Sequence, residues 1–344
     1  MPTLTGGGPR LASPAMEPRA TVVIITRDRL AYLQEAIASV QAQVGVSHEL
    51  IIADNGSTDG TRDWLARRDD LLAVHADQDP ARTRSGNISI ARNAGLARAR
   101  GEYVWFLDDD DRMRPGALAA LAAALDEHPA AVVAVGARTR FGDDVVGGRI
   151  AHPLRQVVGD LGPELLLSWG WVPSQALCRV SVLRLAGAWR EDLPHAEDFE
   201  LWTRLLSRGP AVLDPGTVVE YRVHAAQTRR YRPGDLRDEL LAPHQAKLAG
   251  GSEARGRALR RAGRSWEQAN IAFNEGDYVR ALLSTLRGAA LSPRLLTSPA
   301  VGPLASRMIV RSALRCWGPT RRWVESRPVL HPGERPRRGT GFLN

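Results

Sequence analysis

The sequence predicts an α/β protein, in which a doubly wound, mostly parallel sheet with a nucleotide-binding half is followed by a helical C-terminal appendage. From Thr21 on, short runs rich in β-branched residues alternate with longer stretches rich in Ala and Leu, as is typical of βαβ units. From about Gly234 the pattern is helical. The 344 residues suffice for two domains, and 44% hydrophobic with 24% charged residues is typical of globular proteins.

Each element of the first part is predicted from its own pattern. The strands are short apolar runs, expected at Thr21–Thr26, Glu49–Ala53, Leu71–His75, Tyr103–Leu107 and Ala131–Val135. The helices have apolar residues at helical spacing, expected at Ala31–Gln43, Gly60–Arg68, Ile88–Arg100 and Pro115–Glu127, the last with proline in its first turn. Ligands of such sheets bind beyond the carboxyl ends of the strands, so the loops after Thr26, Ala53 and Leu107 should form one site.

The pattern after Arg138 is mixed and then helical. We expect a hairpin at residues 139–149, a strand at 174–180, a helix at Glu197–Ser207 and a strand at Thr217–Val223. A helix pair, Ser265–Glu275 and Tyr278–Leu291, and an amphipathic stretch at Leu304–Trp317 should follow. The predicted division is a flexible leader at 1–18, an α/β domain at 19–232, helices at 233–327 and a disordered basic tail at 328–344.

Composition excludes several classes of protein. Cys178 and Cys316 are far apart in sequence, so a disulfide framework is not expected, and the N-terminus has no apolar core of a signal peptide. No apolar run approaches the roughly 18 residues that span a bilayer. We therefore expect a cytoplasmic protein. Lys247, the only lysine, lies in HQAKLAG, which is not a phosphate-binding loop with the G-x-x-x-x-G-K pattern.

The net charge of +8 is concentrated in the C-terminal third. Residues 231–344 hold 20 Arg or Lys and 9 Asp or Glu, whereas residues 1–230 hold 26 and 29. Such an asymmetry indicates either contact with an anionic lipid or polyanion, or solvated helix faces. Peripheral contact with the inner face of a membrane through this region is therefore one expectation.

The strongest candidate for chemistry is the apolar run GEYVWFL, which leads directly into Asp108, Asp109, Asp110 and Asp111. Adjacent carboxylates repel one another, and a divalent cation relieves that repulsion. Mg²⁺ or Mn²⁺ is expected, because proteins hold such ions with a few carboxylates plus substrate phosphates. The alternative is a solvated acidic turn that caps the helix after Pro115.

Two further acidic positions follow predicted elements. Asp54 ends a strand, where it can accept hydrogen bonds from a base or a ribose, whereas Ser57 and Asp59 are equally well explained as caps of the next helix. Glu197 and Asp198 begin a helix, where acidic residues are favoured by the helix dipole. One of them could instead act as a general base.

Five segments, in order, resemble the motif set of family 2 glycosyltransferases, inverting enzymes with the glycosyltransferase-A (GT-A) fold. They are TVVIITRDR, IIADNGSTDGT, ISIARNAGLARARGEYVWFLDDDDRMRPGAL, AEDFELWTRLL and EYRVH, which together extend from Thr21 to His224. Each motif alone is weak, but five in order are specific. In the first loop, Asp28 stands where the family usually has Asn.

The resemblance implies roles for particular residues of a GT-A catalytic domain. Asp198 matches the catalytic base, and the metal ligands would be Asp110 and His224. The residues that match the donor-binding positions are Thr26, Arg29, Asp54, Arg92, Asp108 and Asp109, with Asp108 and Asp110 forming the DXD motif. Asp198→Asn should then abolish transfer and spare donor binding.

The implied activity is metal-dependent transfer of a hexosyl group, with inversion, from a nucleotide-diphosphate sugar to an acceptor hydroxyl. Bacterial polysaccharide, glycolipid or natural-product glycosylation would be the setting. Nucleic acid is not an expected partner. The alternatives are a non-catalytic sugar-nucleotide-binding protein, a nucleotidyltransferase, an aspartate-nucleophile phosphatase and a sugar hydrolase. A nucleotidyltransferase usually needs a lysine near its phosphate loop, and a phosphatase needs D-x-D-x-[TV], whereas here Arg112 and Met113 follow Asp111.

Overall fold

The computed structural model describes residues 17–143, 148–149, 155–167, 171–224, 236–298 and 301–316. The strands are β1 (Ala20–Thr26), β2 (His48–Asp54), β3 (Leu72–His75), β4 (Tyr103–Asp108), β5 (Arg112–Met113), β6 (Val133–Gly142), β7 (Gly148–Arg149), β8 (Val157–Gly159), β9 (Ala176–Arg179) and β10 (Ala211–Val223). The predicted tail from Pro328 and most of the predicted leader lie outside the described residues.

The α-helices of the first part are α1 (Leu30–Gln41), α2 (Thr61–Ala66), α3 (Arg84–Arg98), α4 (Ala117–Glu127), α5 (Gly162–Leu167), α6 (Val180–Leu185) and α7 (Glu197–Leu206). The C-terminal helices are α8 (Leu236–Leu241), α9 (Gln245–Leu248), α10 (Glu253–Asn274), α11 (Tyr278–Leu291), α12 (Arg294–Thr297) and α13 (Gly302–Cys316). In the described part of the chain, no helix combines the length and the apolar character needed to cross a bilayer.

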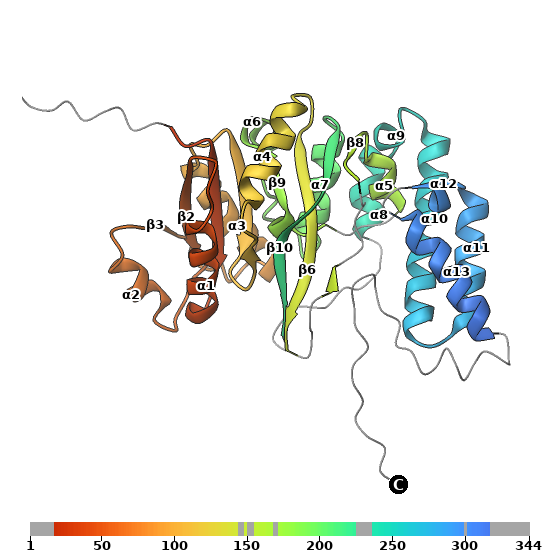
Figure 1. Cartoon of the computed structure of the whole chain (residues 1–344), viewed down its shortest axis with the longest axis horizontal. Helices are drawn as coiled ribbons and strands as arrows, with labels where there is room; N and C mark the ends of the chain where they lie inside the picture. Colours follow the sequence, from red (N-terminus) through yellow and green to blue (C-terminus); the bar gives the residue numbers. More distant parts are fainter. Residues whose placement is uncertain are drawn as a thin grey trace, which may run out of the picture.

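One mixed sheet runs through the first part in the order β3-β2-β1-β4-β9-β6-β10-β5. β1 is parallel to β2 and β4, β6 is parallel to β10, and β9 lies antiparallel between β4 and β6. The five long strands β1, β2, β4, β6 and β10 therefore point the same way, and their carboxyl ends share one edge (Figure 1). The register pairs Thr26 with Asp54 and Ile25 with Asp108, so three of the predicted loops meet there.

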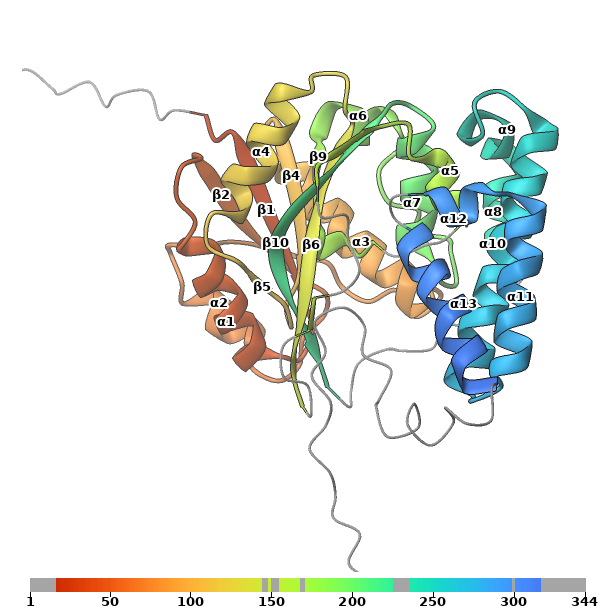
Figure 2. The ribbon, with the colours of Figure 1, turned by 45° about the vertical axis from the view of Figure 1, so that its right-hand side comes forward.

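Helices cover both faces of the sheet, as the continuous apolar runs of the strands predict. In β1, Val22 and Ile24 pack with α1 and α4, whereas Val23 and Ile25 pack into the core on the other face. Figure 2 shows α1 and α2 on one side of the sheet and α3 and α7 on the other.

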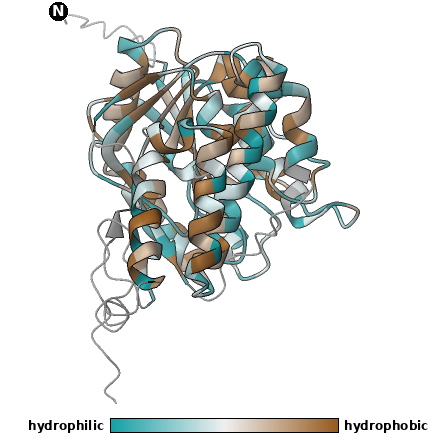
Figure 3. Cartoon of the chain, turned by 90° about the vertical axis from the view of Figure 1, so that its right-hand side faces the viewer, coloured by the Kyte–Doolittle hydropathy of each residue, from teal (hydrophilic) through white to brown (hydrophobic). Residues whose placement is uncertain are grey.

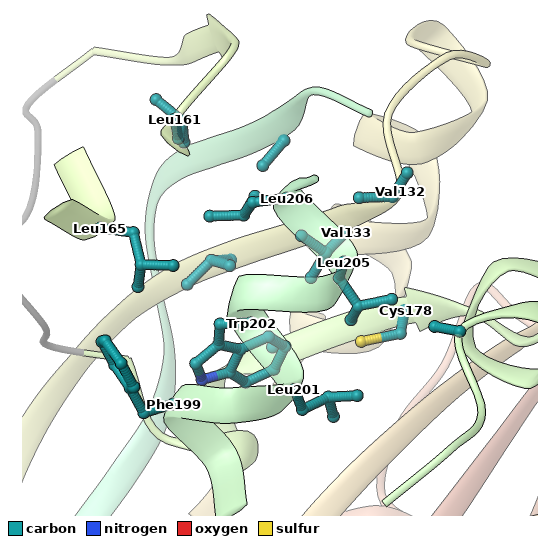
Figure 4. Packing of buried hydrophobic residues seen from close by; sticks show 14 of the residues in the cluster. Val132, Val133, Leu161, Leu165, Cys178, Phe199, Leu201, Trp202, Leu205 and Leu206 are labelled. Atoms are coloured by element: carbon teal, nitrogen blue, oxygen red, sulfur yellow. The ribbon is translucent and has the colours of Figure 1, made fainter. Parts of the chain in front are cut away.

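The larger core joins the sheet to the C-terminal helices. Figure 4 shows Phe199 and Trp202 of α7 between the sheet and Leu165 of α5. The same cluster continues into the buried Leu248 and Trp266. Gly263 of α10 lies directly against α5, since a Cβ there would meet the carbonyl oxygen of Leu166 and lie 2.8 Å from that of Leu167. The helical region thus packs directly on α5.

The predicted fold class and elements are confirmed, but several elements begin or end at other residues. β10 begins at Ala211 instead of Thr217, β6 ends at Gly142 instead of Val135, and α3 begins at Arg84 instead of Ile88. Two further differences concern helices. The expected proline in the first turn of α4 is wrong, because Gly116 makes a left-handed turn (φ 74°) after Pro115 and the helix begins at Ala117. The first helix of the C-terminal pair begins at Glu253 instead of Ser265, capped by the Ser252 hydroxyl. The hairpin expected at 139–149 is present as β6 paired with β7.

Candidate active site

Polar side chains from four strand ends gather at the carboxyl edge of the sheet. Thr26 ends β1, Asp54 ends β2, Asp108 ends β4, and His224 follows β10 directly. The first two strands and β4 are parallel neighbours, and a sheet of this kind brings the ends of such strands together.

Asp109 is held by the loop after β1. Its Oδ2 accepts a hydrogen bond from the Thr26 hydroxyl at 2.8 Å, and its Oδ1 is 3.1 Å from Nη1 of Arg29. Burial, and then the charge of Asp110, raise the pKa of Asp109 to about 7, although Arg29 and Thr26 act in the opposite direction. Near neutral pH this carboxyl group therefore exists in both protonation states.

The carboxylates of Asp108, Asp110 and Asp111 form a compact oxygen cluster. Each offers one oxygen, and these oxygens all lie within 4.8 Å of one another. Oδ1 of Asp111 accepts a hydrogen bond from the backbone N–H of Arg222 at 2.9 Å, but its Oδ2 is buried and has no hydrogen-bond partner among the described residues. Burial and the charges of Asp110 and Asp108 raise the pKa of Asp111 well above its ordinary value.

An imidazole completes this cluster. Nε2 of His224 lies 3.0 Å from Oδ2 of Asp110, and the ring lies beside that of Tyr32 with centroids 5.5 Å apart. Hard carboxylate oxygens with an imidazole, and an unpartnered buried oxygen on Asp111, fit a divalent cation such as Mg²⁺ or Mn²⁺. Arg29 Nη1, 2.9 Å from Asp110 Oδ2, supplies part of the positive charge near the same oxygen.

Asp54 forms a separate buried acceptor on the β2 side of the edge. Its oxygens accept hydrogen bonds from the backbone N–H of Ser57 (3.1 Å) and from Nε of Arg62 (3.0 Å), and His75 Nδ1 lies 3.2 Å away. Burial opposes ionisation of this carboxyl group, but the hydrogen bonds outweigh it and lower its pKa. Asp54 is therefore a fixed negative charge.

Arg92 of α3 joins the acidic run to the start of α7. This buried guanidinium lies over the Trp189 ring, 4.3 Å from its centroid, and its two terminal nitrogens reach Asp108 (3.2 Å) and Glu197 (3.3 Å). The Arg92 guanidinium thus links the end of β4 to the start of α7.

Asp198 is the second residue of α7, beside Glu197. The left-handed backbone of Ala196 (φ 63°) turns the chain into the helix at this point. Burial, and then the charge of Glu197, raise the pKa of Asp198 to about 8, although the Phe199 N–H donates to its Oδ1 at 2.7 Å. A carboxylate with a raised pKa, close to a charged cluster such as that of Arg92, Glu197 and Asp108, has the properties of a general base.

Residues 21–158 match the model of the family "Glycosyl transferase family 2". The chain carries a family 2 glycosyltransferase domain. It is 30% identical over 55% of its length to the uncharacterized protein y4gI of Sinorhizobium fredii. It is also 36% identical over 30% of its length to a GalNAc(5)-diNAcBac-PP-undecaprenol β-1,3-glucosyltransferase of Campylobacter jejuni. The chain spans only 20% and 33% of these two relatives, respectively.

The fold of the glycosyltransferase domain is also found in a solved structure. TarS residues 1–349 of S. aureus, crystallised with UDP-GlcNAc, align over 86% of this chain and 89% of their own with a TM-score of 0.57. At 15% sequence identity this likeness shows the GT-A fold alone.

The residues that the sequence singled out in the glycosyltransferase domain lie along this edge. The contacts link Thr26, Arg29, Asp109, Asp110 and His224, whereas Asp54 lies apart with its own partners. Asp198 is linked to the acidic run through its neighbour Glu197, which contacts Arg92, which in turn contacts Asp108.

Two residues of this region were given no individual role by the resemblance. Asp111 belongs to the oxygen cluster, and Arg222 donates to it from its backbone and from its side chain Nε to the carbonyl oxygen of Asp110 at 2.9 Å. Asp111 was visible as the last member of the acidic run. Arg222 lies 111 residues further along the chain, within the EYRVH segment. Its contact with Asp111 could not be predicted, because only the register of β10 brings the two residues together.

Proposed function

We propose that this protein is a divalent-cation-dependent, inverting glycosyltransferase that moves a sugar from a nucleotide-diphosphate sugar to an acceptor hydroxyl. The observation that carries the proposal is the double contact of Arg92, which holds the acidic run at Asp108 and the Glu197–Asp198 pair around one position. Cation-binding carboxylates and a carboxylate suited to take a proton are the two groups that such a displacement needs.

The donor would lie along the sheet edge. Asp109, whose position Thr26 fixes, would accept a hydrogen bond from the nucleoside. Asp54 would do so in place of its present contact with Arg62 or His75. The oxygens of Asp108, Asp110 and Asp111 with His224 would hold the cation, which when bound neutralises the charge that develops on the diphosphate leaving group. Arg29 and Arg92, which contact these carboxylates, would orient the diphosphate.

Asp198 would act on the acceptor. As the acceptor oxygen attacks the anomeric carbon from the face opposite the diphosphate, a new C–O bond forms while the bond from that carbon to the diphosphate oxygen breaks. The leaving nucleoside diphosphate takes the bonding electron pair, and the acceptor proton passes to Asp198. The raised pKa of Asp198 makes it a stronger base than an ordinary aspartate once it is ionised.

The acceptor is proposed as a hydroxyl group of a bacterial polysaccharide, glycolipid or natural product. The names of relatives support this class, since one is a glucosyltransferase of an undecaprenol-linked saccharide and another a putative teichuronic acid biosynthesis glycosyltransferase. A cytoplasmic location remains part of this proposal.

A thermal-shift panel of UDP, GDP, dTDP and CMP, with and without Mn²⁺ or Mg²⁺, tests the proposal on the wild type and on Asp110→Asn. A ligand at 100 times its Kd stabilises by about 2.7 kcal/mol, which such a scan detects. We expect a shift for one nucleotide that needs the cation and is lost in Asp110→Asn. A panel without any shift would contradict the proposal.

Release of nucleoside diphosphate from the matching sugar donor then separates enzyme from binder. Asp198→Asn should bind the nucleotide like the wild type and lose turnover by about 10²–10⁴-fold, as expected for a general base. Asp192→Asn, an exposed carboxylate paired with Arg190 shortly before α7, is the matched control and should turn over normally. Cation-dependent nucleotide binding without turnover in the wild type would favour a non-catalytic sugar-nucleotide-binding protein.

A further inference from the structure

Helix α11 is apolar on two opposite faces. Its inner face, with the buried Ala281, Thr285 and Gly288, packs on the neighbouring helices. Its outer face carries Val279, Leu283 and Leu286, which are 58%, 62% and 46% exposed. A surface helix ordinarily has polar residues on its outer face, so aliphatic residues at i, i+4 and i+7 there are informative.

Helix α13, which packs beside α11, carries exposed aliphatic residues as well. Val310 and Leu314 are 57% and 38% exposed. Val310 also lines a shallow hollow together with Ser306, Arg307 and Arg311. Figure 3 views the molecule from the side of the C-terminal helices and shows hydrophobic and hydrophilic stretches alternating along them.

The charged residues of α11, α12 and α13 all have one sign. Residues 278–316 contain six arginines and no aspartate or glutamate. Arg307, Arg311 and Arg315 follow one another at intervals of four on α13, so like charges lie on one face of the helix, which is unfavourable in isolation. Burial, and then the charges of Arg307 and Arg315, lower the pKa of Arg311. An anionic partner would relieve this repulsion.

One end of each of these two helices lies on the active-site side of the molecule. In Figures 1 and 2 the end of α13 and the turn between α10 and α11 lie at the same level as the carboxyl ends of β6 and β10. His224, which contacts Asp110, follows β10 directly. A surface that met the ends of these helices would therefore lie near the level of the sheet edge where the site is.

From these observations we infer that the outer face of α11 and α13, formed by Val279, Leu283, Leu286, Arg307, Val310 and Arg311, docks on an anionic lipid surface. The aliphatic side chains would enter the boundary between headgroups and acyl chains, and the arginines would contact lipid phosphates. The binding does not depend on the proposed sugar transfer, so the two proposals can fail separately.

The mixture of side chains favours lipid over other occupants. A polyanion would use the arginines but would leave five exposed aliphatic side chains in water. A second copy of the same face would place arginine against arginine, because this segment has no acidic residue to pair with them. The charge also disfavours the C-terminal segment of this chain, residues 317–344, which holds six arginines and two glutamates.

Vesicle flotation of the full chain tests this inference. Vesicles of phosphatidylcholine mixed with phosphatidylglycerol are compared with vesicles of phosphatidylcholine alone. We expect the protein to float with the anionic vesicles only, and added salt to weaken the binding because the phosphate contacts are screened. Protein that stays unbound with both kinds of vesicle, or binds both equally, overturns the inference.

Two double variants assign the binding to the named face. Arg307→Gln/Arg311→Gln should weaken partition into anionic vesicles by roughly thirtyfold, at about 1 kcal/mol per arginine. Leu283→Ser/Leu286→Ser should weaken it by about tenfold or more. The matched controls are Arg67→Gln, at the exposed residue directly after α2, and Leu185→Ser on α6, a leucine 78% exposed on another part of the surface. Both controls should bind like the wild type.

The same variants identify the competing outcomes. If both double variants bind anionic vesicles as tightly as the wild type, another part of the chain makes the contact and the inference is wrong. It is also wrong if the wild type is a dimer by light scattering, both double variants are monomers, and vesicle binding is unchanged. Circular dichroism and the thermal midpoint of each variant exclude loss of folding as the cause of any loss of binding.

Discussion

Arg92 shows how a single side chain can decide the geometry of the candidate site. It is buried, it lies against Trp189, and it contacts Asp108 and Glu197, which are 89 residues apart in number. The sequence marked Arg92 only as a donor-binding position. Its second contact depends on the packing of α3 against α7, which no local pattern encodes.

The same limit applies to most contacts between site residues. The acidic run, Thr26 and Asp54 could be predicted, because each directly follows an apolar strand and such strand ends share an edge. The contact partners of these residues could not be predicted, because they are distant in sequence. Thr26 and Asp109 are 83 residues apart, and Asp110 and His224 are 114 residues apart. These contacts follow from strand order and register, which depend on the whole fold.

The raised pKa of Asp198 leads to a prediction about pH. The base must be ionised to take the acceptor proton, so kcat/KM should rise with pH up to about 8. Glu197 contributes to the raised pKa through its negative charge, so Glu197→Gln should lower the pKa of Asp198 and move this rise to lower pH. Donor turnover measured across the neutral to alkaline range checks it, with the exposed Glu239→Gln as control. An unmoved profile in Glu197→Gln would show that Asp198 does not set it.

The protonation of Asp109 predicts how stability depends on pH without divalent cations. The folded state keeps this proton up to about pH 7, whereas an unfolded chain releases it near pH 3.9. The folded state therefore binds more protons between these values, and the free energy of unfolding should fall as pH rises through this range. Urea unfolding in EDTA at several pH values measures the slope.

Asp109→Asn removes the titrating carboxyl group. Between about pH 4 and pH 7, the free energy of unfolding should therefore fall by roughly 1–3 kcal/mol less in the variant than in the wild type. Asp126→Asn is the control, because the pKa of Asp126 is lowered by its hydrogen bond from Arg19 and it titrates below this window. Equal slopes in wild type and Asp109→Asn would contradict the assignment.

At the scale of elements, the bounds of a helix or strand were predicted best where residues of one type dominate its sequence. The strands β1, β2, β3, β4 and β6 were predicted to within two residues at their first positions, because continuous β-branched runs have few alternative structures. The start of β10 was predicted six residues late, at Thr217 instead of Ala211, because Asp214, Pro215 and Gly216 interrupt its apolar run. Helix α10 was predicted twelve residues too short at its start. Gly256 and Gly263 together with several arginines hid its first turns, since glycine in a helix interior is unfavourable.

Gly263 is required by packing, and this predicts the effect of a substitution. Gly263→Ala adds a Cβ against the carbonyl oxygens of Leu166 and Leu167, which belong to backbone and cannot move aside easily. The higher helix propensity of Ala, about 1 kcal/mol, should not offset this overlap. We expect a net loss of about 1–3 kcal/mol in the free energy of unfolding.

Chemical denaturation of the two forms measures this loss. Gln268→Ala, on the exposed side of the same helix, raises propensity without new contacts and should change stability by no more than about 0.5 kcal/mol. A more stable Gly263→Ala protein would mean that α10 and α5 can separate without loss, and that α10 is not seated on the sheet domain as described.

At the scale of the molecule, the C-terminal helices share a core with the sheet domain. Trp266, Leu248 and Leu295 are buried with Leu166 and Leu205 in one cluster. The sequence predicted a domain boundary near residue 232 from the change of pattern. The change of pattern is real, but a boundary also needs few contacts across it, and that condition depends on tertiary packing.

Two shortened chains test that boundary. A chain ending at residue 316 keeps the whole described core, whereas a chain ending at residue 232 exposes the side of α5 and α7 that Leu248, Trp266 and Leu295 now cover. Exposed apolar surface of this kind destabilises a domain by about 25 cal/mol per Å² and promotes aggregation. We therefore expect the longer form to unfold cooperatively with the thermal midpoint of the full chain, and the shorter form to aggregate or melt without a cooperative transition.

Gel filtration and calorimetry of both forms distinguish these outcomes. A soluble, cooperatively folded chain of residues 1–232 that still binds nucleotide with a divalent cation would make residues 19–232 an independent domain. The core shared with α9, α10 and α12 would then add stability to the catalytic fold without being needed to form it.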